Sequence, residues 1–298
     1  MTTAPHTESS GRNGVYAVLL VQALLASGTH LVAKVVVTQI DAFTLTLVRS
    51  LIATGGMVLV LQSAGGRLAI EKRDLPLVLF LAFLAVPVNQ FLFLLGIRYT
   101  TASNAALLYA TTPILVVLFS RWLLKEKLTR QRIAGVLLGF AGVTIVIFER
   151  GVDASIDNLA GNLIIYCAVL AWGLYTVLGK RLISTYGPIR STSLTLIVGT
   201  ILFLPVGIWS AVQFPFDRLA LESWLQILYL GLITSVVAYM LWYYALSRAE
   251  AGKVAVFTNL QPLLTTVLAV LLLDQDVTVA FIVGGSVAIG GVVLAQFG

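Results

Sequence analysis

Three ionisable side chains lie inside long apolar stretches of the chain, and all three are basic: His30, Lys34 and Arg49. A charge at membrane depth is costly, so each needs a partner or a function. Lys34 follows His30 by one helical turn, which places both on one helix face. We predict that this face borders a central cavity, where Lys34 attracts an anionic group such as a substrate carboxylate. Alternatively, Lys34 extends to the lipid headgroups and His30 bonds a neighbouring helix. Arg49 is expected to be structural, bonding helix-end carbonyls or Asp41.

The carboxylates have the opposite distribution, because all 13 lie in tails, loops or the ends of apolar stretches. An intramembrane carboxylate is the usual proton relay and the usual partner of a cationic drug. Its absence argues against a carboxylate-driven drug antiporter and against an intramembrane aspartyl protease. The sequence shows no Walker loop, no catalytic Ser/His/Asp or Cys/His set, and no cluster with metal-ligand spacing. We therefore predict no enzymatic activity, no cofactor and no metal.

Neutral polar and aromatic residues complete the candidate site. Pro113 and Pro262 each interrupt an apolar stretch, and such a proline kinks a helix and frees a carbonyl one turn earlier. Freed carbonyls at membrane depth must face protein or a wet cavity. The two prolines are therefore predicted hinges beside a binding site, with plain packing as the alternative. The predicted substrate-binding residues are His30, Lys34, Asn89, Gln90, Tyr109, Thr112, Trp172, Tyr175, Tyr239, Tyr243, Thr258, Asn259 and Gln261.

These residue types favour one class of substrate. A cavity with aromatic walls, few polar groups and one basic end suits an amphiphilic amino acid. Two alternatives stay open. The amides Asn89 and Gln90 could bond helix to helix, and the aromatic side chains could simply pack between helices.

The apolar stretches themselves set the class of protein. The 298-residue chain is 59% hydrophobic and 11% charged, with a mean hydropathy of +0.98, whereas a soluble domain is about 25% charged. This composition is typical of a polytopic membrane protein. The net charge of +6 is assigned to cytoplasmic loops rather than to a nucleic-acid partner, because the cations lie between apolar stretches. Ten spans are predicted, at residues 14–37, 42–62, 75–97, 101–124, 131–149, 159–182, 188–212, 223–247, 252–273 and 278–297.

One stretch of the chain is used twice. Residues 95–143 align without a gap with residues 244–292, at a constant offset of 149. The matching pairs include Ala102 with Ala251, Pro113 with Pro262, Gly135 with Gly284 and Gly142 with Gly291. Ten spans divide into five and five, and an odd number inverts the second half in the membrane. The predicted fold is all-α, with ten transmembrane helices as two inverted five-helix repeats: a cytoplasmic tail at 1–13 and repeats at 14–150 and 151–298.

The distribution of lysine and arginine predicts the orientation. With a cytoplasmic N-terminus, 14 of the 19 basic residues fall in inner segments. The positive-inside rule therefore places both termini in the cytoplasm. Glycines in spans five and ten are predicted to let helices approach closely. A dimer face is the lesser option for these glycines, so the chain is expected to be a monomer or a dimer.

Several motifs carry a family resemblance. They are Val48-Arg49-Ser50-Leu51 in span two, Leu124-Lys125-Glu126 closing span four, Trp172-Gly173 leading to Lys180, and the prolines of spans four and nine. With the two repeats, they make nearly the whole chain resemble the drug/metabolite transporter superfamily, EamA type. Ser27 stands where the first half usually has Trp, and Asp274-Gln275-Asp276 replaces the usual Glu closing span nine. Within the superfamily the chain is similar to the bacterial aromatic amino-acid exporters (YddG-type).

The resemblance implies a secondary transporter that exports amino acids or related small metabolites across the bacterial inner membrane. It implies alternating access around a midplane site walled by spans one, three, four, six, eight and nine. The expected partners are a small-molecule substrate and the lipid bilayer. The alternatives are a nucleotide-sugar or phosphate-type carrier, which would want more than one basic residue in the cavity, an intramembrane enzyme acting on lipid-linked substrates, and a non-transporting sensor or scaffold. Both facilitated transport and a proton link through His30 stay open.

Overall fold

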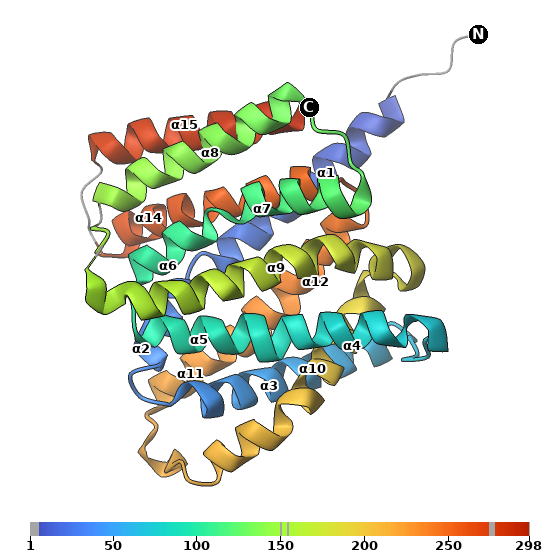
Figure 1. The fold of residues 1–298 in the computed structure, drawn as a ribbon, viewed down its shortest axis with the longest axis vertical. Coiled ribbons are helices and arrows are strands. Elements are labelled where there is room, and N and C mark those ends of the chain that lie inside the picture. The colour runs from blue at the N-terminus through green and yellow to red at the C-terminus, as the bar shows by residue number, and fades with distance from the viewer. Residues whose placement is uncertain (1–5, 150, 154, 274–277, 298) are drawn as a thin grey trace.

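The computed structural model describes residues 6–149, 151–153, 155–273 and 278–297. Within these ranges the regular structure is entirely helical, and the helices lie side by side in one bundle (Figure 1). Residues 1–5 of the predicted tail and the motif Asp274-Gln275-Asp276 lie outside the described residues. The first helix begins at His6, inside the predicted tail, and its apolar part begins at Gly14.

The helices follow the predicted order in both halves. The first half contains α1 (His6–Ala26), α2 (Thr29–Val36), α3 (Ala42–Ser63), η1 (Lys72–Asp74), α4 (Leu75–Phe83), η2 (Leu84–Gln90), α5 (Phe91–Arg98), α6 (Ala102–Tyr109), α7 (Thr112–Phe119), η3 (Ser120–Leu124) and α8 (Arg130–Glu149). The second half contains η4 (Ile156–Asn158), α9 (Leu159–Tyr186), α10 (Pro188–Ala211), η5 (Phe216–Arg218), α11 (Leu221–Leu228), η6 (Tyr229–Val237), α12 (Ala238–Leu246), α13 (Ala251–Ala255), η7 (Val256–Asn259), α14 (Leu260–Leu273) and α15 (Val279–Gln296).

Nine stretches among the described residues are helical, long and apolar enough to cross a membrane. They correspond to nine of the ten predicted spans. The remaining predicted span, 252–273, is built by α13, η7 and α14, which follow one another without a gap. The chain is therefore an all-helical polytopic membrane protein, as its composition predicts.

One end of the bundle gathers basic residues, and we call it the basic end. The helices α4 and α8 begin there and α9 ends there, on the right in Figure 1. The residues at that end include Lys72, Arg73, Lys125, Lys127, Arg130, Lys180, Arg181, Arg248 and Lys253. The other end, where α8 ends and α6 and α9 begin, is called the opposite end.

Span one is broken between α1 and α2. The hydroxyl of Tyr229 donates to the Leu25 carbonyl at 2.7 Å, next to the break. A Cβ added at Gly28 would lie only 2.8 Å from that hydroxyl. Glycine at position 28 thus leaves room for this tyrosine of the other repeat. The break itself lies at residues 27–28. It redirects the chain just before His30.

Spans three and eight each contain a widened, π-helical segment. In span three this is η2, which includes Pro87, and in span eight it is η6. A π-bulge shifts the hydrogen-bond ladder and is frequent at functional sites. The two segments come from the same position of the two repeats, and residues of both reach the centre of the bundle.

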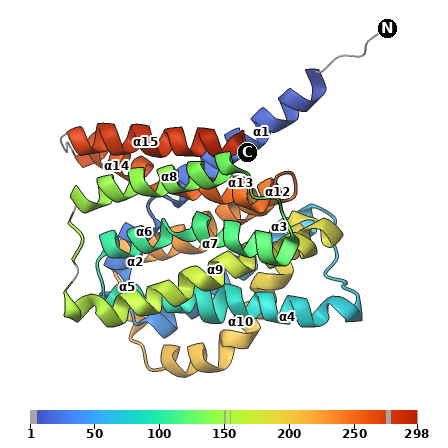
Figure 2. The same ribbon diagram turned by 45° about the horizontal axis from the view of Figure 1, so that its top comes forward.

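The fifth helices of the two repeats, α8 and α15, pack against each other in both views (Figures 1 and 2). Gly135 contacts the Gly291 carbonyl, and Gly142 contacts the Gly284 carbonyl. Under the repeat offset, Gly135 corresponds to Gly284 and Gly142 to Gly291. The two contacts therefore exchange under a two-fold rotation, as in an isologous interface. The glycines pack the repeats together within the chain, and the helices run antiparallel, as an inverted repeat requires.

The same helices are capped alike. Thr129 accepts a hydrogen bond from the Arg132 amide at 3.1 Å, and Thr278 accepts one from the Phe281 amide at 3.1 Å. These threonines are 149 residues apart, which is the repeat offset. An N-cap side chain satisfies a free amide of the first turn, so sequence and local structure repeat together.

Candidate functional site

A cavity lies at the centre of the bundle and is lined by both repeats. It offers about 100 Å³ to the centres of water-sized molecules, which is room for several waters at about 10–15 Å³ each. The structure places eight of the predicted binding residues and one predicted hinge in its wall: His30, Asn89, Gln90, Tyr109, Trp172, Tyr239, Thr258, Gln261 and Pro262. Six larger lining residues were not in the predicted set: Gln22, Thr29, Arg49, Phe93, Thr234 and Trp242. Substrate binding by the predicted residues stays a prediction.

Aromatic rings form two facing groups around this cavity. In the second repeat, the ring centroid of Trp172 lies 5.1 Å from the ring centroid of Tyr239 and 5.8 Å from that of Trp242. In the first repeat, the ring of Tyr109 lies 5.3 Å from His30 and 5.6 Å from Phe93, both edge to face. Such rings combine large apolar surface with polar edges. Each repeat thus contributes one aromatic wall.

Asn89 connects these walls by hydrogen bonds. Its Nδ2 donates to the Tyr109 hydroxyl at 3.0 Å and to the Ala168 carbonyl at 2.9 Å. Its Oδ1 accepts a long hydrogen bond of 3.5 Å from the Tyr239 hydroxyl. The helix-to-helix bonding considered for Asn89 is therefore present, and the same side chain also faces the cavity.

Several polar atoms in the wall have no protein partner among the described residues. They are Oε1 of Gln22, Nε2 of His30 and Nε1 of Trp242, all buried. The side-chain amide of Gln90 is also buried beside the Tyr239 hydroxyl, and neither its nitrogen nor its oxygen has a hydrogen-bond partner of ordinary geometry among the described residues. Buried polar groups normally have partners. Water or a bound solute in the cavity can supply them.

Arg49 is a cation in the cavity wall, although it was expected to be only structural. It is 4% exposed. Its Nε donates to the Leu230 carbonyl at 3.1 Å and to Ser235 Oγ at 3.0 Å, and Nη2 donates to Thr234 Oγ1 at 3.1 Å. All three acceptors belong to η6, so Arg49 bonds the widened segment of span eight. Neither a hydrogen bond nor an ion pair joins it to Asp41.

Lys34 does not line the central cavity. Its Nζ donates to the Ile97 carbonyl at 2.9 Å and to the Thr100 carbonyl at 2.6 Å. These carbonyls lie at the C-terminal end of α5, where a cation complements both the free acceptors and the helix dipole. Lys34 was predicted to face the cavity, but its ammonium is directed to these backbone carbonyls instead. Its hydrogen bonds join span one to the end of span three.

Four other predicted binding residues also lie outside the wall. Tyr175 bonds Thr195 at 2.9 Å and stacks on Tyr243 at 5.3 Å, so both tyrosines pack behind Trp172. Thr112 and Asn259 are fully buried, and the Asn259 amide packs against Gly139 of α8. The surroundings of these four side chains fit the alternative in which they pack between helices.

Both proline-bearing spans are interrupted as predicted. In span four, α6 ends at Tyr109 and α7 begins at Thr112, one residue before Pro113. In span nine, η7 gives way to α14 at Leu260, two residues before Pro262. Tyr109 and Pro262 border the cavity, whereas Pro113 is buried outside it. Bending at these positions stays a prediction.

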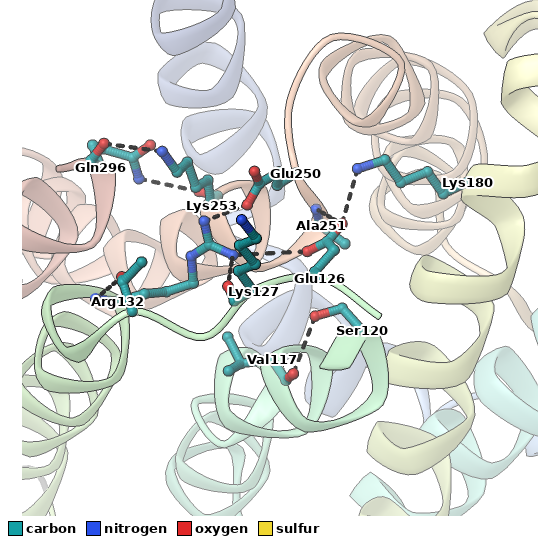
Figure 3. A network of polar contacts seen from close by, with 11 residues as sticks. Val117, Ser120, Glu126, Lys127, Arg132, Lys180, Glu250, Ala251, Lys253 and Gln296 are labelled. Atoms are coloured by element: carbon teal, nitrogen blue, oxygen red, sulfur yellow. Dashed lines mark hydrogen bonds and ion pairs between the residues drawn. The ribbon is translucent and has the colours of Figure 1, made fainter. Parts of the chain in front are cut away.

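Ion pairs tie the two repeats together at the basic end (Figure 3). Glu126 accepts from Lys180 Nζ at 3.0 Å and from the Ala251 amide at 3.2 Å, and it lies 3.9 Å from Arg132 Nη1. Arg132 also pairs with Glu250. This network joins the loop after η3 and the first turn of α8 to α9 and to the start of α13.

A second, smaller cavity continues from the central one toward the opposite end. It shares His30, Ala106 and Pro262 with the central cavity. It also reaches Ala102 at the start of α6 and Ile147 near the end of α8. The hollow part of the bundle therefore extends away from the ion pairs of the basic end.

The wall residues that the sequence analysis did not include differ in the strength of their sequence signal. An ionisable residue inside a span is a functional candidate by default, and that rule favoured Arg49. Gln22 and Thr29 give a weaker signal because single polar residues in a span commonly bond a neighbouring helix. Among the described residues, no three His, Cys, Asp or Glu side chains are grouped to hold a metal.

Comparison with known proteins identifies the family. The model of the EamA-like transporter family matches the chain twice, at residues 13–148 and 159–297. An uncharacterized transporter of Archaeoglobus fulgidus is 30% identical, over 93% of this chain and 95% of its own length. The uncharacterized transporter YetK of Bacillus subtilis is 28% identical, over 94% of this chain and 86% of its own length.

A solved crystal structure of another protein has the same fold. It covers 95% of this chain and 96% of its own chain with a TM-score of 0.80, at 20% sequence identity. At that identity the likeness concerns the fold alone. Together with the two family matches, the repeats and the helical bundle show that this chain belongs to the EamA-like transporter family, within the drug/metabolite transporter superfamily, and is a non-enzymatic membrane carrier.

Proposed function

We propose that this carrier exports aromatic or other amphiphilic amino acids and related small metabolites. The observation that supports it is the composition of the central cavity. Two aromatic walls, around Trp172 and Tyr109, face a small number of neutral polar groups and one cation. An apolar site with few convergent polar groups is the usual form of a small-molecule site.

The cavity chemistry matches the two parts of such a substrate. An aromatic or aliphatic side chain would pack against Trp172, Tyr239 and Trp242. The amino group would find acceptors in the unpartnered Oε1 of Gln22 and in Asn89 Oδ1. No carboxylate lines the cavity among the described residues, so the site is unlike the acidic sites that attract cationic drugs.

The proposed mechanism is alternating access between the two repeats. Inverted repeats carry a site at their interface and expose it to each side by rocking. Bending at Pro113 and Pro262 would accompany the movement. The positive-inside rule puts the basic end in the cytoplasm, and the proposed location is the bacterial inner membrane. In that orientation the hollow toward the opposite end corresponds to an outward-facing state.

A nucleotide-sugar or phosphate-type carrier is the second candidate. Multiply charged phosphates are bound by several Arg and Lys side chains acting together. The wall of the central cavity presents Arg49 alone among the described lysines and arginines. A single cation therefore favours a substrate with one anionic group.

Counterflow of labelled phenylalanine in proteoliposomes tests the proposal. Wild type and Trp172→Ala are compared with no ion gradient. Flux in the wild type that falls in the variant supports an aromatic-walled amino-acid site and shows that downhill transport needs no gradient. Absence of flux from well-folded wild-type protein would remove the amino-acid assignment and call for a substrate panel with an imposed proton gradient.

A further inference from the structure

We propose that Arg49 forms an anion subsite that binds the carboxylate of the transported substrate. The inference builds on the proposed function, since it names the group in the cavity that recognises one part of that substrate. It differs from the sequence-based expectation, which gave this role to Lys34.

The guanidinium has donor capacity left over. Nε is engaged by Leu230 and Ser235, and Nη2 by Thr234. Nη1 has no protein acceptor in the part of the chain that the structure describes, and the residue lines the cavity. The guanidinium is therefore fastened along one edge and still has donors for a ligand. A planar fork of this kind matches a carboxylate in geometry as well as charge.

No counter-charge accompanies Arg49. The residue is almost fully buried, and no described Asp or Glu forms an ion pair with it or lines the cavity. Asp41, the acid on the same helix, caps that helix by accepting from the Phe43 and Thr44 amides and from Ser210 Oγ. A buried charge without a partner is unfavourable. A substrate carboxylate would provide the missing charge.

The contacts of Arg49 also fix its position before a ligand arrives. The acceptors lie on η6 of the second repeat, whereas Arg49 lies on α3 of the first. Holding a binding group in place reduces the ordering cost of binding. A carboxylate at this site would sit at the junction of the repeats, where its presence or loss can favour one arrangement over the other.

Lys34 provides the comparison within the same chain. Its ammonium is occupied by the carbonyls of Ile97 and Thr100 and lies outside the cavity wall. Both residues are cations inside predicted spans, but Arg49 alone of the two faces the cavity. Removing each charge separately therefore separates the two assignments.

Paired ligands test the subsite independently of transport. The probes are phenylalanine with phenylalanine amide, and 3-phenylpropionate with 3-phenylpropionamide, titrated against the tryptophan fluorescence of purified protein. The wild type should bind the carboxylate of each pair at least about tenfold more tightly. Arg49→Gln should abolish that preference, Arg49→Lys should keep part of it, and Lys34→Gln should keep it. A folded Arg49→Gln protein with the wild-type preference would overturn the proposal.

Chemical protection gives a second measurement on the unmodified protein, in case Arg49→Gln does not fold. Phenylglyoxal modification of Arg49, followed by mass spectrometry, should be slowed severalfold by 3-phenylpropionate and unaffected by the amide. Equal modification rates with and without 3-phenylpropionate, or equal protection by chloride, would overturn the role of Arg49 in substrate binding. Carboxylate preference without phenylalanine flux would refute the amino-acid proposal and leave the subsite standing. Phenylalanine flux in the wild type, combined with an unchanged preference for the carboxylate ligands in Arg49→Gln, would support the amino-acid proposal and refute the subsite.

Discussion

Lys180 of the second repeat donates a hydrogen bond to Glu126 of the first, with Nζ 3.0 Å from Oε1. The same oxygen accepts from the Ala251 amide at the start of α13. The Glu126 side chain is 10% exposed, so this pair is better shielded from water than the surface ion pairs that contribute little. Since it joins the repeats at the basic end, we expect it to hold that end closed.

Glu126→Gln should therefore open the basic end more often. The substitution keeps the shape of the side chain and removes the charge that attracts Lys180. Access is measured with Gln261→Cys in the cavity wall, in a background where Cys167 is replaced by Ala. An impermeant maleimide added from the basic side should label this cysteine severalfold faster in the Glu126→Gln protein.

The matched control is an exposed ion pair at the same end. Glu71 and Arg73 lie 2.8 Å apart, and both side chains are more than half exposed. Glu71→Gln should leave the labelling rate unchanged because such a pair is worth little. Equal labelling rates in the Glu126→Gln and reference proteins would show that the network does not control access.

Removal of the central indole should reduce recognition of aromatic substrates. Trp172 contacts Tyr239 and Trp242 and forms much of the second-repeat wall. Trp172→Ala is expected to weaken phenylalanine binding about tenfold, which corresponds to about 1.4 kcal/mol. Trp172→Phe should recover part of the affinity. Tryptophan at position 122, which is largely exposed, gives the control: Trp122→Ala should bind phenylalanine like wild type.

The fold could be predicted because its determinants are repeated and periodic. The offset between Pro113 and Pro262 recurs in the glycines of α8 and α15, and composition alone indicates membrane spans. The predicted span limits are mostly within a few residues of the helices. The exception is α1, which starts at His6, because a helix can continue beyond the apolar stretch into polar sequence.

The cavity wall was harder to predict than the fold. Lys34 and Arg49 are both basic residues in spans, and their roles depend on how the neighbouring backbone is hydrogen-bonded. Lys34 meets the free carbonyls ending α5, whereas Arg49 meets the widened η6. No composition rule reveals η6, since it contains no proline. Tyr175 illustrates a related limit, because periodicity shows a helical face but not whether a second layer of side chains covers it.

Pro113→Ala should impair transport more than expression. The proline stands at the junction of α6 and α7, and restoring its backbone amide would allow a continuous, stiffer helix. We expect severalfold slower counterflow at a normal membrane level of protein. Pro205→Ala, at a proline inside α10 and outside the cavity wall, is the control and should retain wild-type flux. Wild-type flux in Pro113→Ala would refute the hinge.

Asp41 should make the stability of the bundle depend on acid pH. Burial raises the pKa of its carboxyl, but hydrogen bonds from Thr44, Ser210 and Phe43 outweigh this, so the pKa lies below the ordinary 3.8. A lowered native pKa gives stability that is present above the unfolded pKa and lost as pH falls through the native one. Thermal unfolding should show wild type more stable than Asp41→Ala near pH 7, by about 1 kcal/mol for a lost cap. The difference should shrink below about pH 4.

Asp41→Asn separates the charge from the cap. Asparagine retains an oxygen that accepts from the first-turn amides, so it should remain more stable than Asp41→Ala. Because asparagine does not titrate, the difference between these two variants should be the same at pH 7 and pH 4. A wild-type advantage over Asp41→Ala that stays constant from pH 7 down to about pH 3 would contradict the role of the charged carboxylate.

Two adjacent glycines in α15 test the contact between the repeats. A Cβ at Gly291 would overlap the backbone of Gly139 and Gly135, whereas a Cβ at Gly290 has no atom within 4 Å. Gly291→Ala should therefore lower the thermal unfolding temperature in detergent, with a cost of about 1–3 kcal/mol for overpacking. Gly290→Ala should be neutral or stabilising, since alanine favours a helix by about 1 kcal/mol over glycine. Equal stability of the two variants would mean that α8 and α15 can separate at no cost. The close two-fold packing of the repeats would then not be what holds the halves together.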